Sequence, residues 1–565
     1  MPIDKQEYQP MRYQSSLIML FCVLLTQTIC QPAQAQQHSW RGFEMGKATI
    51  DDITAKLGPS PIETAGRQDL RYPSTQDSNL CDRLYFVNRK LELAQSASTD
   101  PRFPNRAAIE EAFGAPEAEV TFQTQEYLDY SEEGFRFICA AGGTTTGVLS
   151  FRPVPRRVPR GYPNTHINLR RELPPATRPL PTVLKVGAAQ VCITPKTLDG
   201  IQSPDAKQEL HVDEDVFARA AIFQSDEQSV VLIGLDVFGM GLWDIQQLRN
   251  SLREKGFPNV IVAMSHTHAN VDTIGFYGYY PEDYANQILK NAEEAVLRAA
   301  ENLDSVSHLQ SGTIEMPLAG GRVVDLIRNG RDPGLVDPSV SVLQAIGADG
   351  KPVVNIVHLA CHPEVIRLKD TNGLSPDFVG TLCRKVTEQL GGQTVFLNGA
   401  LGGMLTPDTR FRTQEAAEEM GTRLSVFAIE AARQAVSCSK DGLFVETVSV
   451  EYPITAAAIS TFLNNPPKPY PVRDGRVTAD MSVIWIGDAQ FVTVPGEVLP
   501  DIGFEIMQEM AGRTRVIVGL ANGELGYLIP GFDFRANGYE ERTGPGAAGG
   551  EITRSIGLQL ARRRP

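Results

Sequence analysis

The sequence is poor in cysteine and has no surplus of basic residues, and each shortage argues against a class of protein. Only eight of its 565 residues are cysteine, and no two of them form a Cys-x-x-Cys pair. A zinc site built from cysteines is therefore not expected. Acidic residues outnumber basic ones by 67 to 53, which gives a net charge of −14. Nucleic acid is not an expected partner, because phosphate contacts require basic surface.

Long apolar runs are also missing after the N-terminus, where residues 1–35 are interpreted as a secretory signal. Arg12 precedes the apolar run Leu17–Leu25, and Ala33-Gln34-Ala35 offers a small-x-small cleavage site. The alternative is a retained N-terminal membrane anchor, although the run is too short to span a bilayer as a stable helix. We favour the signal and expect an exported protein that is periplasmic, envelope-associated or secreted.

Residues 44–152 are predicted to form a small α+β domain with a weak internal repeat. The stretch "ITAKLGPSP" (53–61) matches "IEEAFGAP" (109–116), and each copy reads as a short amphipathic helix that ends at glycine. A strand-like run follows each copy. Cys81 and Cys139 both lie in this region and could pair in an exported protein, or they could be buried thiols.

The segment 153–183 is predicted to be a linker, because its dense prolines prevent regular structure. Its arginines could contact anionic lipid heads at a membrane surface. The alternative is a solvated spacer, which we favour.

From residue 184 to residue 565 the pattern predicts an α/β domain with mixed sheets flanked by helices. Apolar runs of strand length, such as "SVVLIGL" and "NVIVAM", recur between helical patterns. In residues 281–303 one helical face is apolar, namely Ile288, Ala292, Ala295, Val296 and Ala299. A second helix is expected from residue 375, with Ser375 as its N-cap and Pro376 in its first turn.

Polar residues that follow the predicted strands are the candidate site, because loops at strand ends are held by a rigid sheet. They are Asp236, His266, His268, His358, His362, Glu497, Tyr527 and Tyr539. Four of the eight histidines thus lie at two strand ends, and imidazole with carboxylate or phenolate oxygen suits zinc. The pair in "SHTH" could be two ligands, or one ligand and one proton-transfer group; a lone strand-end histidine could also be structural.

Taken in order, these motifs resemble the neutral (non-lysosomal) ceramidase family over about residues 184–562. They are "VGAAQVCITP" (186–195), "SHTH" (265–268), "VDPSVSVLQA" (336–345), "ACHPEVI" (360–366), "LNGALGGMLTP" (397–407), "PGE" (495–497) and "GYLIP…GYE", in which Tyr527 and Tyr539 stand twelve apart. The resemblance implies hydrolysis of an amide, with ceramide or a related N-acyl lipid as substrate, by a zinc-activated water.

Carried over by position, the resemblance implies that zinc is held by His266, His362, Glu497 and Tyr527. His268 and Tyr539 would then line the site beside the scissile carbonyl, and Arg322 in "AGGRVVD" matches a family arginine more loosely. Asp236 and Asp377 are interpreted as structural or ligand-orienting residues, and Asp337 as the cap of a turn.

Two departures from the family pattern leave other functions open. The position of a family serine in "NGALGG" is Ala400, and the chain ends without the immunoglobulin-like C-terminal domain of the true ceramidases. The alternatives are a non-catalytic envelope protein that binds a partner on a ceramidase-like scaffold, and an esterase or amidase for a non-lipid substrate. The aromatic loop 272–282 could line an acyl or sugar pocket or could cap the sheet. The sequence does not indicate an oligomeric state.

Overall fold

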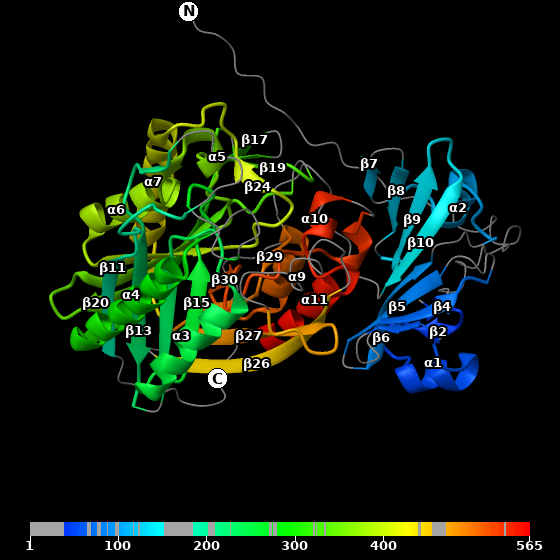
Figure 1. Ribbon diagram of the computed structural model, residues 1–565, viewed down its shortest axis with the longest axis horizontal. Helices are drawn as coiled ribbons and strands as arrows, with labels where there is room; N and C mark the ends of the chain where they lie inside the picture. The colour runs from blue at the N-terminus through cyan, green and yellow to red at the C-terminus, as the bar shows by residue number, and fades with distance from the viewer. Residues whose placement is uncertain are drawn as a thin grey trace, which may run out of the picture.

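The computed structural model describes residues 39–564 of the chain with gaps (Figure 1). The gaps are residues 61, 65–68, 76–80, 88, 97–100, 117, 123–124, 131, 152–184, 202–208, 227, 271–273, 275–279, 320–321, 324, 333–334, 439–441, 455–469 and 536–537. Several predictions fall outside the described residues: the signal at 1–35, the linker at 153–183, and the aromatic side chains of the loop 272–282 other than Tyr280. Cys139 is a buried free thiol, so the suggested pairing of Cys139 with Cys81 is wrong and the alternative of a buried thiol holds for Cys139.

The N-terminal domain consists of two copies of one unit, a short helix followed by a four-stranded antiparallel meander. Helix α1 (Ile50–Leu57) ends at Gly58 and helix α2 (Arg106–Phe113) ends at Gly114, as the repeated motif predicts. Both glycines have a φ near +80°, a conformation in which a Cβ would be strained. A hairpin, β1 (Ser39–Trp40) and β2 (Phe43–Glu44), precedes the first copy.

The two meanders join edge to edge into one eight-stranded sheet of order β3-β4-β5-β6-β10-β9-β8-β7. Its strands are β3 (Ile62–Thr64), β4 (Asp69–Pro73), β5 (Cys81–Val87), β6 (Lys90–Ser96), β7 (Ala118–Phe122), β8 (Gln125–Tyr130), β9 (Phe135–Ala140) and β10 (Thr145–Phe151). All of its pairings are antiparallel. The repeat seen in the sequence is therefore a repeat of supersecondary structure.

From Lys185 onward the described chain is centred on a large mixed sheet of order β15-β14-β13-β11-β16-β20-β21-β23. The strands are β11 (Lys185–Cys192), β13 (Phe217–Gln224), β14 (Ser229–Leu235), β15 (Val260–Met264), β16 (Asp304–Glu315), β20 (Ser339–Gly347), β21 (Pro352–Leu359) and β23 (Gln393–Asn398); β25 (Val436–Ser437) also pairs with β16. The β14–β15 and β21–β23 pairs are parallel. The mixed α/β fold predicted from the alternating pattern is confirmed.

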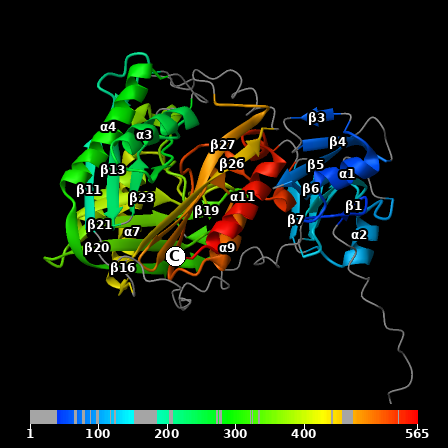
Figure 2. The same cartoon turned by 90° about the horizontal axis from the view of Figure 1, so that it is seen from below.

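A second sheet packs face to face on the large one, so the layers run helix, sheet, sheet, helix (Figures 1 and 2). Its strands are β26 (Leu443–Pro453), β27 (Arg476–Ile486), β28 (Ala489–Thr493) and β30 (Thr514–Val518). Helices α3 (Leu242–Glu254), α4 (Glu282–Glu301), α6 (Phe378–Leu390) and α7 (Gln414–Arg433) cover the large sheet, and α9 (Pro500–Glu509) and α11 (Ala547–Ala561) cover the small one. The N-terminal domain lies against α11 (Figure 2).

Short elements build the loops above the sheets. They are β12 (His211–Val212) with β22 (Gly373–Leu374), the set β17 (Leu318–Ala319), β18 (Arg322–Val323), β19 (Ile327–Asn329) and β24 (Leu405–Pro407), the pair β29 (Glu497–Val498) and β31 (Tyr527–Leu528), the helices α5 (Leu368–Thr371) and α10 (Tyr539–Arg542), and the 3₁₀ turn η1 (Gly531–Asp533). These loops carry most of the candidate residues.

Helix α4 shows how the sequence sets the layers. The predicted apolar face is buried, from Ile288 to Ala299. The helix comes so close to β11 that a Cβ on Gly187 would lie 2.0 Å from the Ala299 carbonyl oxygen. Only glycine fits at this crossing, so a larger residue there would push the helix away from the sheet.

Helix α6 begins two residues later than predicted, so the assignment of Ser375 as its N-cap is wrong. Its N-cap is Asp377, whose carboxylate accepts a hydrogen bond from the Phe378 amide at 2.6 Å. The Ser375 hydroxyl instead accepts from the Asp377 amide at 3.0 Å and caps the preceding turn. The helix ends at Gly391, as expected.

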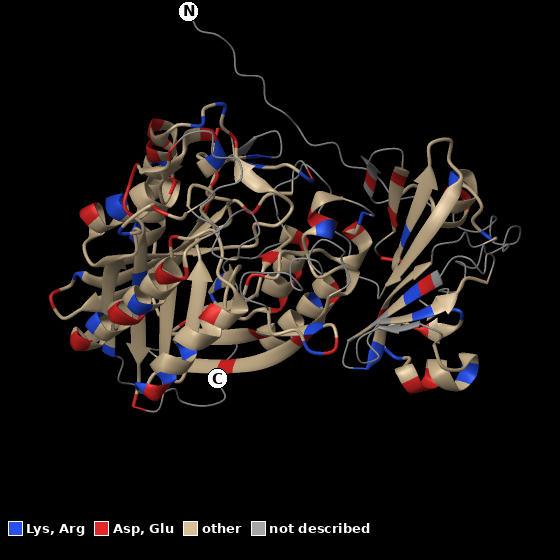
Figure 3. Cartoon of the chain, in the orientation of Figure 1, with Lys and Arg blue, Asp and Glu red and all other residues tan. Residues whose placement is uncertain are grey.

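The distribution of charged and apolar residues fits the mixed, net acidic composition of the sequence. Lys and Arg are interspersed with Asp and Glu along the described chain (Figure 3). No helix among the described residues is long and apolar enough to cross a membrane.

Candidate active site

Candidate residues from separate parts of the chain converge at the ends of their strands. His266 and His268 follow β15, and His362 follows β21. Their ligand nitrogens all lie within 4.8 Å of one another. Glu497 and Tyr527 are direct partners in the parallel pair β29–β31. The structure therefore brings together all four residues that the resemblance implied as zinc ligands.

Asn398, at the end of β23, holds the two histidine loops at a fixed spacing. Its side-chain amide donates to the Ser265 carbonyl at 2.9 Å and to the Cys361 carbonyl at 2.8 Å. Its carbonyl oxygen accepts from the Cys361 amide at 3.2 Å. Sequence reasoning missed this residue, although it opens the motif "NGALGG".

His266 is held in a strained conformation. Its φ is +69°, in the left-handed region, where a non-glycine residue costs on the order of 1 kcal/mol. Its Nδ1 lies 2.6 Å from the Phe238 carbonyl oxygen, and the Phe238 ring packs on the imidazole at a centroid distance of 4.4 Å. Since a carbonyl only accepts, Nδ1 carries the proton and Nε2 presents its lone pair to the site. Strain of this kind is concentrated at functional sites.

His362 and Glu497 form the buried centre of the group. The His362 Nδ1 donates to the Leu405 carbonyl at 2.9 Å, and its Nε2 lies 2.9 Å from Glu497 Oε2. The same carboxylate oxygen is 3.6 Å from His266 Nε2. Burial raises the pKa of Glu497, but the two histidines outweigh it and the net shift is downward. Burial lowers the pKa of His362, and its bond to Glu497 turns the net shift upward.

These contacts fit a bound cation. Two imidazole lone pairs aimed at one carboxylate repel it unless a proton or a metal ion lies between them. Two atoms bound to one tetrahedral zinc at about 2.0–2.1 Å lie about 3.3 Å apart. The observed separations of 2.9 and 3.6 Å fall on either side of that value. Carbonyl acceptors on Nδ1 are also the outer partners that metal-binding histidines use.

His268 differs from the other two histidines. Its side chain is 22% exposed, against 1% for His266 and none for His362. Its Nε2 is buried and has no hydrogen-bond partner in the described structure. Burial and the two neighbouring histidines hold its pKa well below the usual range.

Glu364 lies beside His268 and was missed in the sequence, although it stands two residues after His362. Its Oε2 is 4.0 Å from His268 Nδ1, and Oε1 accepts from the Thr406 hydroxyl. Its backbone carbonyl accepts from Arg412 at 2.7 Å. The carboxylate is thus fixed on the far side of the imidazole from the orphan Nε2.

The two tyrosines stand at different depths. Tyr527 is buried, and its hydroxyl donates to the sulfur of Met404 at 3.3 Å. Burial, followed by the Glu497 carboxylate, holds the pKa of Tyr527 well above its usual value. The Tyr539 ring lies 6.0 Å from the Tyr527 ring and is 46% exposed. Tyr539 therefore stands between the buried group and solvent.

Arg322 does not join this group. It lies on β18, nearly half exposed, and pairs with Asp408 at 2.9 Å. The described contacts of Arg322 include none with the three histidines, so its proposed role has no geometric support.

Ala400, at the position of the family serine, faces the apolar core. It is 3% exposed and packs with the residues of α9, where a Cβ on Gly503 would lie 2.8 Å from its own. The Ala400 methyl group therefore packs against α9 at the position where the family pattern has a serine hydroxyl.

The contacts of three aspartates are structural, which is one of the two roles predicted for Asp236 and Asp377 and the role predicted for Asp337. Asp236 pairs with the buried Arg219 at 2.6 Å. Asp377 accepts from the amides of Ile366 and Phe378, and burial raises its pKa to about 7. Asp337 caps a turn by accepting from the Ser339 amide at 2.9 Å.

A second group of buried carboxylates, Asp332, Asp501 and Asp533, also has the spacing of a metal site. Arginines already neutralise part of it: Arg535 pairs with Asp332 at 2.7 Å, and Arg331 pairs with Asp533 at 2.6 Å. We therefore assign no metal to this group.

His358 lies inside β21, and its Nε2 donates to the Ile517 carbonyl at 2.8 Å, so it is a structural histidine. Burial lowers its pKa to about 4. In the unfolded chain the His358 imidazole has a pKa near 6.5 and binds a proton below that pH, whereas in the folded protein it stays neutral down to about pH 4. The free energy of unfolding therefore falls as the pH drops from about 6.5 to about 4. In the metal-free wild type, protonation of His358 should lower the free energy of unfolding by on the order of 2 kcal/mol between pH 6.5 and pH 5. We expect His358→Gln to abolish this loss.

Urea unfolding in the presence of a chelator measures this difference. His308→Gln, on β16 of the same sheet, is the matched control for the loss of an imidazole. An unchanged pH dependence in His358→Gln would place the acid sensitivity elsewhere.

Comparison with known proteins finds this architecture in solved ceramidases. The crystal structure of neutral ceramidase from Pseudomonas aeruginosa matches with a TM-score of 0.56 and 18% sequence identity, over 68% of this chain and 74% of that one. A ceramidase complexed with C2 matches with a TM-score of 0.55 and 17% identity over the same shares. No protein-family model and no curated protein matches the sequence. The predicted ceramidase-like fold is confirmed.

Proposed function

We propose that the protein is an exported zinc-dependent hydrolase that cleaves the amide bond of ceramide or a related N-acyl compound. The proposal is carried by one observation, the convergence of two carbonyl-anchored histidines on one carboxylate, beside a buried phenol. The ceramidase-like fold supports a lipid amide as the substrate class.

His266, His362, Glu497 and Tyr527 would hold the metal. When bound, zinc supplies a Lewis acid that lowers the pKa of water to about 7 and polarises a carbonyl group. All four residues are less than 6% exposed, so a metal ion held by them would be shielded from bulk water.

The remaining chemistry belongs to residues at the opening of the site. His268 accepts the proton of the attacking water at its orphan Nε2 and passes it to the leaving amine. The Tyr539 hydroxyl is exposed enough to meet the substrate and donates a hydrogen bond to the developing oxyanion. Because water is the nucleophile, no serine is needed at position 400.

Ala400 favours one competing function, a non-catalytic envelope protein that uses the fold as a binding scaffold. An esterase or amidase acting on a non-lipid substrate is the other alternative. Both alternatives keep the histidine group. The scaffold would hydrolyse no substrate, whereas the esterase or amidase would hydrolyse a substrate that is not a lipid.

The test is zinc content by elemental analysis of the purified protein, together with hydrolysis of a short-chain fluorescent ceramide. We expect about one zinc per chain, with activity abolished by a chelator and restored by added zinc. Failure to bind zinc when it is supplied would refute the enzyme proposal. Bound zinc without turnover on a panel of N-acyl amides and esters would favour the scaffold.

A further inference from the structure

The N-terminal domain contacts the chain segment that joins the two tyrosines of the candidate site. Tyr527 opens this segment, Tyr539 ends it, and η1 lies between them. The Phe532 ring of η1 is fully buried and lies 5.7 Å from the Phe151 ring of β10. A Cβ on Gly531 would lie 3.0 Å from Leu93 Cδ1 of β6. The middle of the segment is thus embedded in the other domain.

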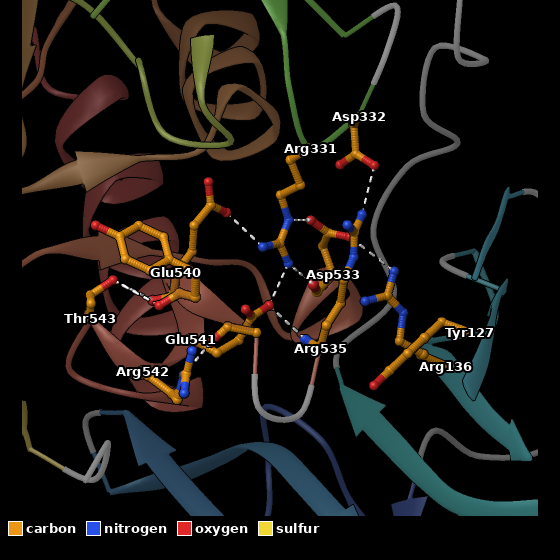
Figure 4. Close-up of polar contacts among 12 residues, drawn as sticks. Tyr127, Arg136, Arg331, Asp332, Asp533, Arg535, Glu540, Glu541, Arg542 and Thr543 are labelled. Carbon is orange, nitrogen blue, oxygen red and sulfur yellow. Dashed lines mark hydrogen bonds and ion pairs between the residues drawn. The ribbon is translucent and has the colours of Figure 1, made fainter. Parts of the chain in front are cut away.

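A buried arginine reinforces this apolar contact. Arg136 on β9 has no exposed surface and forms a two-point ion pair with Asp129 of its own domain, one contact being 2.6 Å. Its Nη2 also reaches Asp533 of η1, at 3.2 Å (Figure 4). The guanidinium therefore bridges a carboxylate from each domain.

Asp533 links Arg136 to a second arginine, Arg331, which lies nearer the candidate site. Its other carboxylate oxygen accepts from Arg331 Nε at 2.6 Å. Arg331 then donates to Glu540 and Glu541, at 2.6 and 2.5 Å (Figure 4). The Glu541 carboxylate also accepts from the Arg535 amide at 2.8 Å. A continuous chain of ion pairs leads from the N-terminal domain to helix α10.

Helix α10 begins at Tyr539 and has only four residues. One helical turn is not stable by itself, so its orientation is set by side-chain contacts. Those contacts are the glutamates held by Arg331, both of which are buried. The backbone amide of Arg331 also donates to the Gly403 carbonyl, next to Met404, the partner of the Tyr527 hydroxyl.

We propose that Arg136 is a positioning residue of the active site, through which the N-terminal domain fixes the segment that carries Tyr539. The inference rests on the proposed function, since it assigns this domain a part in the reaction. The domain is then an integral part of the enzyme rather than an independent binding module. Charge supports the direction of the effect: three arginines form ion pairs with five buried carboxylates here, and the buried Asp501 lies close by, so each guanidinium is needed.

The test uses the full chain with the double substitution Asp129→Asn and Arg136→Leu, which removes both members of the buried pair and leaves no lone charge in the N-terminal sheet. We expect hydrogen exchange of peptides within 531–543 to accelerate by about tenfold, with zinc content unchanged. The kcat for a short-chain ceramide should fall by about 10- to 100-fold with little change in KM, because misplacement affects the transition state.

Arg106→Leu is the matched control, since Arg106 forms ion pairs with glutamates on the exposed side of the same domain. It should change neither exchange at 531–543 nor kcat. If the double variant does not fold, Arg136→Lys takes its place in the same measurements, because one ammonium group cannot bridge Asp129 and Asp533 together.

Unchanged exchange at 531–543 in a folded variant would overturn the proposal, as would faster exchange with an unchanged kcat. A wild-type protein that binds no zinc or hydrolyses nothing would refute the proposed function instead. The exchange result would then decide by itself whether the two domains are coupled.

Discussion

The variant His362→Ala is expected to purify without zinc and to lose hydrolysis of N-acyl substrates. The substitution removes the Nε2 that lies 2.9 Å from Glu497 and leaves that carboxylate buried beside one remaining imidazole. Loss of even an outer partner of a metal ligand weakens metal binding by about 10- to 100-fold, so loss of a ligand should exceed that. Elemental analysis and a zinc titration measure the effect directly.

His358→Gln is the matched control for this variant. His358 is also buried, lies four residues earlier, within β21 itself, and has the Ile517 carbonyl as its partner. It should keep its zinc and its activity at neutral pH. If His362→Ala retained zinc at the wild-type level, the metal centre would have to be assigned to other residues.

The parts of the fold that the sequence predicted are those governed by local periodicity. The apolar face of α4 and the glycine stops of α1 and α2 follow from side-chain spacing and from the left-handed conformation that glycine tolerates. The start of α6 was misplaced because Ser375 and Asp377 both make capping hydrogen bonds, and only the backbone path decides which of them begins the helix.

The part of the candidate site that lies at the ends of strands could be predicted from the sequence. His266, His362, Glu497 and Tyr527 each follow or begin a strand, and the ordered resemblance placed them in one set. Asn398 and Glu364 were not predicted, because their roles depend on contacts between loops far apart in the chain. The strained φ of His266 has no signal in the sequence at all.

The docking of the N-terminal domain was equally hidden from the sequence. Arg136 and Asp533 are 397 positions apart, and nothing in either stretch marks the other as a partner. Both side chains have no exposed surface, so each needs charged partners, and these partners come from both domains.

The second large effect is expected from His268→Ala, which should keep zinc while kcat falls by about 10²- to 10⁴-fold, the range for a lost proton-transfer group. The geometry separates this histidine from the buried pair. Its side chain is the most exposed of the three, and Glu364, rather than a backbone carbonyl, lies beside its Nδ1. Zinc analysis combined with steady-state kinetics tests both halves of the expectation.

Chemical rescue distinguishes a proton carrier from a third metal ligand. The alanine variant leaves a space beside the exposed side of the site, so added imidazole should restore part of kcat without changing the zinc content. Loss of zinc in His268→Ala would instead mean that all three histidines bind the metal, which their mutual spacing within 4.8 Å permits. Proton transfer would then have to pass to Tyr539 or Glu364, and the equivalent test on Glu364→Gln would follow from the same contacts.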